Sequence, residues 1–196
     1  MLEPSPEDAV LACDLDGTLL RVNTFPVFVR FALVQLARQG SARAFLALAL
    51  ALVRRKVLRR TSHLRFKEQV HRAGLAVHQR QLSGWAAALL AGQSHPEVVR
   101  LVQDWPGTTV LCTAAPSCYA DVLGALAGFD AVQATGWSGQ HYVENVRQAK
   151  ADRLTREVGR PIACAVSDDV DLDGPLLALA ARPLVVDRLG HVSDWS

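Results

Sequence analysis

Two carboxylates, one residue apart, follow a short apolar segment near the start of the chain. Residues 9–13 are typical of a buried strand, and Asp14 and Asp16 come directly after it, with Gly17 and Thr18 next. Ligands bind at the carboxyl ends of strands in open α/β sheets, and side chains two apart on extended backbone point the same way. Carboxylates held this close need a cation or a shared proton. The pattern therefore suggests a divalent-metal site with a carboxylate nucleophile and a carboxylic acid.

Other polar residues stand at comparable places further along. Thr113 ends a second apolar segment, Asp168 and Asp169 follow a third, and Lys150 opens a predicted helix between them. A hydroxyl and a lysine can bind an oxyanion, and carboxylates bind hard cations. Each residue also has an ordinary structural explanation, because strand-end threonines, solvated lysines and acidic helix starts are common.

Taken together, these segments match, in order, the motifs of the haloacid dehalogenase-like phosphohydrolases. Residues 14–18 match the first motif, DxDGT, and residues 110–115 resemble the second, a hydrophobic strand that ends in Thr or Ser. Lys150 resembles the third motif, with Arg147 and Arg153 as nearby alternatives. Residues 163–177 resemble the fourth, an acidic strand end. The resemblance covers the predicted catalytic core well and residues 24–95 poorly.

The resemblance implies a role for each residue. Asp14 would attack a phosphoryl group to form an aspartyl-phosphate, and Asp16 would act first as general acid and then as general base. Thr113 would hydrogen-bond a phosphoryl oxygen, and the backbone of residues 114–116, Ala114 among them, would add N–H donors. Lys150 would offset negative charge on Asp14 and the phosphoryl group.

The implied cofactor is Mg²⁺, because a carboxylate that attacks an anionic phosphate needs a cation between them. We expect the side chains of Asp14 and Asp168 and the backbone carbonyl of Asp16 to bind it. Asp169 and Asp173 are expected to support it.

The fourth motif departs from the common GDxxxD form of the family. Ser167 replaces Gly, and Asp173 comes five residues after Asp168 instead of four. We therefore predict a one-residue longer loop before a helix over residues 173–180. The departure leaves Asp171 as an alternative to Asp173 for the metal-supporting acid.

Composition indicates a globular chain. Half of the 196 residues are hydrophobic and 20% are charged, and a formal net charge of +2 gives no reason to expect nucleic-acid binding. Three of the four cysteines, Cys13, Cys112 and Cys164, lie in apolar segments and are interpreted as core thiols. Free thiols and an acidic N-terminus without a signal-peptide pattern predict a cytoplasmic protein.

Apolar segments alternate with helical segments, which predicts an α/β fold with a parallel sheet. The resemblance implies a three-layer Rossmann-like core with strand order 5-4-1-2-3 and an inserted all-helical cap. We assign residues 1–22 and 95–196 to the core and residues 23–94 to the cap. The cap is predicted to hold four helices, at about residues 25–38, 42–59, 63–74 and 77–91.

A basic stretch lies within the predicted cap. Between Arg54 and Arg72 there are eight Lys or Arg residues, and Glu68 is the only acid. A solvated helix face is the simplest explanation, and an anionic substrate, a membrane surface or an acidic partner are the alternatives. The apolar residues 44–53 are too few to span a bilayer, which takes about 20. We expect them to be buried in the cap, with a helix lying on a membrane as the less favoured alternative.

The predicted activity is Mg²⁺-dependent hydrolysis of a phosphomonoester, either a small or a lipid-linked phosphorylated metabolite. The cap position resembles that of the phosphoserine phosphatase-like branch. Relatives that act on phosphoserine carry a Glu where this chain has Asn23, which disfavours phosphoserine itself. The alternatives are a non-catalytic or regulatory binding module and a phosphotransferase. The sequence leaves the oligomeric state open.

Overall fold

The computed structural model describes residues 9–195, so that residues 1–8 of the predicted core lie outside the described part of the chain. These residues form one seven-stranded sheet in the order β4-β3-β2-β1-β5-β6-β7. Five central strands run parallel, in the order that the family resemblance implied, and β4 and β7 are antiparallel edges. The strands are β1 (Val10–Cys13), β2 (Thr108–Pro116), β3 (Ala131–Ser138), β4 (His141–Val143), β5 (Ile162–Ser167), β6 (Ala180–Val186) and β7 (Val192–Asp194).

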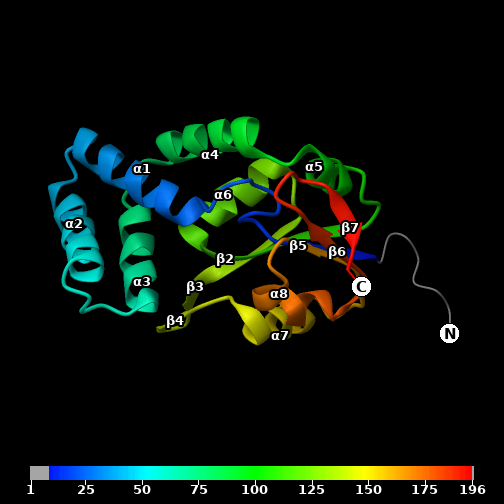
Figure 1. The fold of residues 1–196 in the computed structure, drawn as a ribbon. Helices are drawn as coiled ribbons and strands as arrows, with labels where there is room; N and C mark the ends of the chain where they lie inside the picture. The colour runs from blue at the N-terminus through cyan, green and yellow to red at the C-terminus, as the bar shows by residue number, and fades with distance from the viewer. Residues whose placement is uncertain (1–8, 196) are drawn as a thin grey trace.

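Helices cover both faces of the sheet and make the predicted three layers (Figure 1). In Figure 1, α7 and α8 lie below the sheet, α4, α5 and α6 lie above it, and α1, α2 and α3 extend beyond its β4 end. The α/β fold class is therefore confirmed, whereas the domain boundaries at residues 23 and 94 stay a prediction. The helices are α1 (Thr24–Arg38), α2 (Ala42–Lys56), α3 (His63–Gly74), α4 (Gln79–Gln93), α5 (Pro96–Gln103), α6 (Ser117–Ala127), α7 (Arg147–Val158) and α8 (Val170–Leu177).

The central strand β1 is buried on both faces. Leu11 and Cys13 belong to the larger hydrophobic cluster, on the side of the cap helices and α6. Val10 and Ala12 belong to the smaller cluster, on the side of α7 and α8. Alternate side chains of a strand point to opposite faces, so a central parallel strand needs apolar residues at every position. The residues that follow β1 are thus held in place from both layers.

An aromatic cluster joins the cap helices to α6. The ring centroids of Phe28 in α1 and Trp85 in α4 lie 4.3 Å and 5.7 Å from that of Tyr119 in α6. Phe31 stacks on Trp85 at 5.2 Å. The Tyr119 hydroxyl lies 3.1 Å from that of Thr24, the first residue of α1. The cluster therefore fixes the start of α1 relative to the carboxyl end of the sheet.

The start of α8 differs from the prediction. The helix begins at Val170 and not at Asp173, because the Asp169 carboxylate caps it. One oxygen of Asp169 accepts hydrogen bonds from the N–H groups of Asp171 and Leu172, at 3.1 Å and 2.9 Å. The predicted longer loop before residue 173 is therefore wrong, and Asp173 lies inside the helix.

The helix α2 contains the apolar residues 44–53 and is buried on one side only. Leu48 and Ala51 are buried, but Leu46 and Leu50 are 63% and 48% exposed. The expectation that residues 44–53 are buried in the cap is wrong for one side of the helix, because α1 and α3 pack against one side of α2 and leave the other uncovered. No helix within residues 9–195 has both the length and the apolar character to cross a membrane.

We expect Phe28→Ala to lower the free energy of unfolding by about 3–5 kcal/mol, because it leaves a cavity between α1, α4 and α6. Leu126→Ala is the matched control, since Leu126 lies on α6 and is 50% exposed. The control should change stability by less than about 0.5 kcal/mol. Urea unfolding followed by circular dichroism measures both. A loss below about 1 kcal/mol for Phe28→Ala would mean that the aromatic cluster is not a main contact of the cap.

Candidate active site

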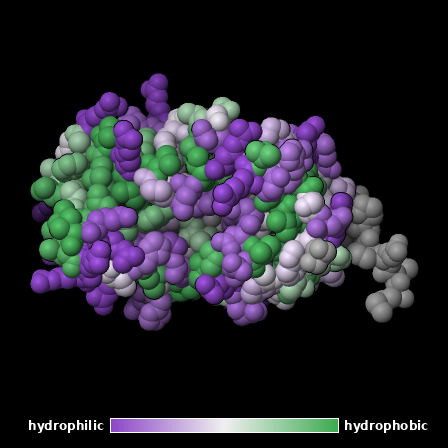
Figure 2. Space-filling model, viewed as in Figure 1, coloured by the Kyte–Doolittle hydropathy of each residue, from purple (hydrophilic) through white to green (hydrophobic). Residues whose placement is uncertain are grey.

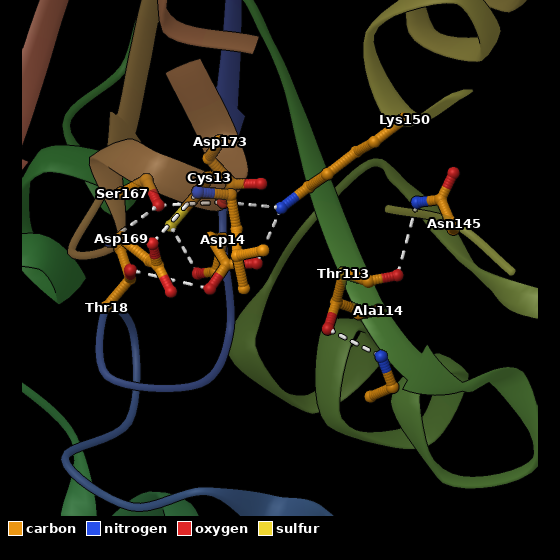
Figure 3. Close-up of polar contacts among 12 residues, drawn as sticks. Cys13, Asp14, Thr18, Thr113, Ala114, Asn145, Lys150, Ser167, Asp169 and Asp173 are labelled. Carbon is orange, nitrogen blue, oxygen red and sulfur yellow. Dashed lines mark hydrogen bonds and ion pairs between the residues drawn. The ribbon is translucent and has the colours of Figure 1, made fainter. Parts of the chain in front are cut away.

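The side chain of the buried Lys150 lies between two carboxylates, those of Asp14 and Asp173 (Figure 3). The Nζ atom of Lys150 lies 2.7 Å from Oδ1 of Asp14 and 2.7 Å from Oδ2 of Asp173. The Ser167 hydroxyl also donates to Oδ2 of Asp173, at 2.7 Å. Burial lowers the pKa of Lys150, but Asp14 and Asp173 raise it by more, so the ammonium stays protonated. Lys150 lies one turn into α7, which starts at Arg147 and not at Lys150 as predicted.

Thr18 joins the residues after β1 to those after β5. Its buried hydroxyl lies 3.0 Å from Oδ1 of Asp168 and accepts a bond from the Asp168 N–H at 2.9 Å. The same hydroxyl lies 3.5 Å from Oδ2 of Asp14. Gly17 has a φ of 83°, and a Cβ there would overlap the Asp168 carboxylate. Gly17 and Thr18 therefore bring the carboxylates of Asp14 and Asp168 to one place.

Asp16 lies next to this pair and is bonded to the first residue of the cap helices. Its Oδ1 atom accepts a hydrogen bond from the N–H of Thr24 at 2.8 Å. Burial raises the pKa of Asp16, the hydrogen bonds from Thr24 lower it, and the charge of Asp168 raises it, with a net increase. A raised pKa favours the protonated carboxyl, which is the form that a general acid needs.

The residues present fit a magnesium ion. Burial raises the pKa of Asp14 to about 7 and also raises that of Asp168, and a cation between two such carboxylates would favour their charged forms. Mg²⁺ prefers oxygen ligands and typically takes one or two carboxylates together with substrate phosphate and water. Within residues 9–195, no group of three or more His, Cys, Asp or Glu side chains is arranged to hold a metal. The fit therefore rests on two carboxylates, together with backbone and substrate oxygens.

Thr113 and Ala114 lie at the end of β2, beside Lys150 (Figure 3). The Thr113 hydroxyl accepts a hydrogen bond from the N–H of Ala115 at 3.0 Å, and a hydroxyl that accepts one bond still has a proton to donate. The carbonyl of Ala114 accepts bonds from Lys67 and Thr135, at 3.1 Å and 2.8 Å. Thr113 is therefore placed where a bound oxyanion can use its proton.

All these acids, together with Thr113 and Lys150, line one pocket of about 600 Å³. Three further cationic side chains line the pocket: Arg21 after β1, Lys67 of α3 and Arg147, the first residue of α7. Lys67 is buried and forms an ion pair with Glu144, which also lines the pocket. The pocket thus offers several positive groups to an anionic ligand.

Sequence reasoning assigned no role to Ser167 or Lys67, and it considered Arg147 only as a nearby alternative to Lys150. Ser167 carried a signal, because it replaces a glycine of the motif, and its hydroxyl bonds to Asp173. Lys67 is one of eight basic residues in its stretch, and only the fold distinguishes it. Asp169 was predicted to support the metal, and the structure shows one of its oxygens capping α8.

The sequence profile of a family described as haloacid dehalogenase-like hydrolase matches residues 11–178. The chain belongs to the haloacid dehalogenase-like hydrolase family. This confirms the predicted family and identifies the protein as a hydrolase. The matched range contains Asp14, Asp16, Thr113, Lys150 and Asp168.

Solved structures share the fold of this family member at low sequence identity. A protein of unknown function from Bordetella pertussis Tohama I superposes with a TM-score of 0.60 at 20% identity, over 92% of this chain and 90% of that one. A probable phosphoserine phosphatase from Vibrio cholerae gives 0.53 at 14%, over 90% of this chain and 55% of that one. A phosphoserine phosphohydrolase-like protein from Francisella tularensis gives 0.53 at 12%, over 92% and 88%. These structures confirm the predicted likeness in fold to the phosphoserine phosphatase-like branch. A search of curated proteins found no match to the sequence.

We expect Gly17→Ala to weaken Mg²⁺ binding at least about tenfold, or ~1.4 kcal/mol, because its Cβ displaces the Asp168 carboxylate. Gly128→Ala is the matched control: its φ of 86° equals that of Gly17 within a few degrees, but no atom lies within 4 Å of its Cβ. Both substitutions should destabilise the fold by about 1–2 kcal/mol through the left-handed backbone. Isothermal titration with Mg²⁺ and urea unfolding measure the two effects. Equal Mg²⁺ affinity in both variants would contradict the role of Gly17.

Proposed function

We propose that this hydrolase is a Mg²⁺-dependent phosphomonoesterase that acts through an aspartyl-phosphate on Asp14. The observation that supports this most is the ammonium of Lys150, 2.7 Å from the Asp14 carboxylate. The same pocket holds the hydroxyl of Thr113 and the carboxyl of Asp16. A nucleophile, a fixed positive charge, an oxyanion donor and an acid are the groups that phosphoryl transfer requires.

In the first step, the Asp14 carboxylate attacks phosphorus, and the bond from phosphorus to the leaving oxygen breaks. Asp16 gives its proton to that oxygen. Thr113 donates a hydrogen bond to a phosphoryl oxygen, and Lys150 offsets the negative charge that Asp14 brings to the phosphate. The carboxylates of Asp14 and Asp168 and the backbone carbonyl of Asp16 would hold Mg²⁺, which would supply the remaining charge neutralisation.

In the second step, water hydrolyses the aspartyl-phosphate. Asp16, now a carboxylate, takes a proton from the water that attacks phosphorus. The bond between phosphorus and the Asp14 oxygen breaks, phosphate leaves, and both acids return to their starting forms. The bond from the Thr24 N–H keeps the Asp16 carboxyl in one orientation during both steps.

The proposed substrate is a small or lipid-linked phosphorylated metabolite. The pocket volume of about 600 Å³ suits a ligand of that size. Arg21, Lys67 and Arg147 line the pocket beyond the reacting groups, and Phe25 gives it an apolar wall on the cap side. These side chains suit an organic phosphate that carries further polar or anionic groups.

We expect Asp14→Asn to lower kcat for p-nitrophenyl phosphate at least about 10³-fold, or ~4 kcal/mol, because the amide has nearly the same shape but cannot attack phosphorus. Asp152→Asn, an exposed acid on α7, is the control and should leave kcat unchanged. The wild type should lose activity in EDTA and regain it with Mg²⁺.

Two results would contradict the proposal. A wild type that binds phosphate esters but turns none over with Mg²⁺ is a binding module. A wild type that passes the phosphoryl group to glycerol in preference to water is a phosphotransferase.

We expect Asp168→Ala and Asp173→Ala to affect different quantities. Asp168→Ala should raise the Mg²⁺ concentration for half-maximal activity at least about tenfold, because it removes a proposed ligand (~1.4 kcal/mol). Asp173→Ala should change that concentration less than about threefold and lower kcat, because Lys150 loses one of its two partners. Activity measured against Mg²⁺ concentration decides between them. A larger change in Mg²⁺ dependence for Asp173→Ala would make Asp173 the metal-supporting acid.

A further inference from the structure

The outer face of α2 carries a stripe of exposed apolar side chains. Its members follow one another at helical spacing, so they lie on one side of the helix, opposite the buried Leu48 and Ala51. Their side chains are between 45% and 71% exposed. They are Leu46, Leu50, Val53 and Val57. A large apolar surface of this kind on a water-exposed helix marks a contact with another surface.

The apolar stripe continues into the loop between α2 and α3. Leu58 is 49% exposed, and Leu64 in the first turn of α3 is 37% exposed. Figure 2 shows apolar side chains gathered over α2, at the end of the molecule formed by the cap, with hydrophilic side chains around them. The patch therefore lies at one end of the molecule.

The segment of the chain that contains the apolar stripe carries charge of one sign. No acidic residue occurs between Asp16 and Glu68, whereas 11 of the 21 Lys and Arg residues of the chain lie in that interval. Several of the basic residues are exposed on α2 or in the loop after it. They are Arg43, Arg54, Lys56, Arg59 and Arg60. The apolar stripe is thus bordered by positive charge without compensating carboxylates in the same segment.

We propose that the apolar stripe of α2, with the basic residues around it, binds an anionic lipid membrane. An amphipathic helix lies in a membrane interface with its apolar residues among the acyl chains and its Lys and Arg residues among the headgroups. Anionic lipids attract clustered basic residues at the same time. The exposed leucines and valines of α2 suit the acyl chains, and the basic residues beside them suit the anionic headgroups.

A second copy of this chain fits the same surface less well. Most homodimer contacts are two-fold, so that the same patch of each subunit faces the other. Such a contact over α2 would place Arg43, Arg54 and Lys56 of one subunit in the same interface as those of the other, without acids in the segment to pair with them. Like charges in such a contact repel, whereas an anionic bilayer attracts them.

Membrane binding by α2 would keep the pocket close to the lipid surface. His63 lines the pocket and comes six residues after Val57, at the end of the apolar stripe. Six residues span at most about 20 Å even when fully extended. Given the proposed phosphomonoesterase activity, on which this step rests, a lipid-linked phosphate in the same membrane becomes the favoured substrate class. The membrane binding itself does not depend on that activity.

Vesicle co-sedimentation tests the proposal. The wild type should bind vesicles of phosphatidylcholine with 30 mol% phosphatidylglycerol more tightly than pure phosphatidylcholine vesicles, and binding should weaken as salt rises. One variant, Leu46→Ser with Leu50→Ser, shortens the apolar stripe. A second, Arg54→Glu with Arg59→Glu and Arg60→Glu, reverses the charge. Each should bind anionic vesicles at least about tenfold more weakly. The first variant loses apolar side chains that would lie among the acyl chains. The second loses three basic residues, each of which contributes about fivefold near the surface.

Matched controls change equivalent residues elsewhere on the molecule. Leu126→Ser with Leu189→Ser alters two side chains that are 50% and 76% exposed, and Arg100→Glu with Arg156→Glu and Arg188→Glu reverses three exposed charges. Both controls should bind vesicles like the wild type. All variants should keep the far-UV circular dichroism of the wild type and its rate on p-nitrophenyl phosphate, which separates loss of binding from loss of folding or chemistry.

Three results would overturn the proposal. The first is a wild type that does not sediment with anionic vesicles. The second is unchanged binding by both the leucine variant and the arginine variant, and the third is that the control variants bind as weakly as those two. Light scattering adds a further decisive outcome. A dimer that is lost in the Leu46→Ser, Leu50→Ser variant, without vesicle binding by the wild type, would assign the apolar stripe to a second copy of the chain. Vesicle binding by a protein without phosphatase activity would keep the membrane site and reject only the proposed chemistry.

Discussion

The buried ammonium of Lys150, between the carboxylates of Asp14 and Asp173, is the interaction on which the site depends. Taking one charged group out of water costs several kcal/mol even after relaxation, so an unpaired Asp14 in this position would be strongly disfavoured. Two contacts of 2.7 Å and the hydroxyl of Ser167 offset that cost. The same contacts tie β1 to α7 and α8, which are distant from it in sequence. The need to neutralise the buried Asp14 carboxylate therefore also determines how the layer below the sheet sits against its carboxyl edge.

The rest of the site is built outward from this pair by short polar contacts. The Thr18 hydroxyl contacts the carboxylates of both Asp14 and Asp168, and Gly17 leaves room for the two carboxylates to approach each other. Asp16 connects in the other direction, through the backbone of Thr24, to the start of α1. Because the aromatic cluster holds α1 on α6, the proposed acid is oriented by the same packing that places the cap. The orientation of Asp16 therefore depends on the position of the cap, although the cap supplies none of the groups proposed to react.

The cap has two distinct polar environments. On its inner side, Lys67 is buried, paired with Glu144 and bonded to the backbone of the strand that carries Thr113. On its outer side, the basic residues are exposed and border the apolar stripe of α2. A buried lysine with fixed partners contributes a directed charge to the pocket, whereas exposed arginines act together as a salt-sensitive field. The single basic stretch of the sequence therefore divides, in three dimensions, between the pocket and the outer surface.

The sequence by itself determined the family, the parallel sheet and the helices between the first two strands. It also grouped the residues of the site, which are Asp14, Asp16, Thr113, Lys150 and Asp168. Both were possible because strand-end acids and apolar segments are local features that recur in a known order. It did not determine that Asp173 pairs with Lys150, or that the Asp169 carboxylate caps α8, because both depend on which elements lie side by side. The exposure of α2 was missed for a related reason. Its Ala and Leu residues surround the whole helix, so periodicity could not indicate a buried side. Only the tertiary structure, in which α1 and α3 cover one side and nothing within residues 9–195 covers the other, decided which leucines meet the solvent.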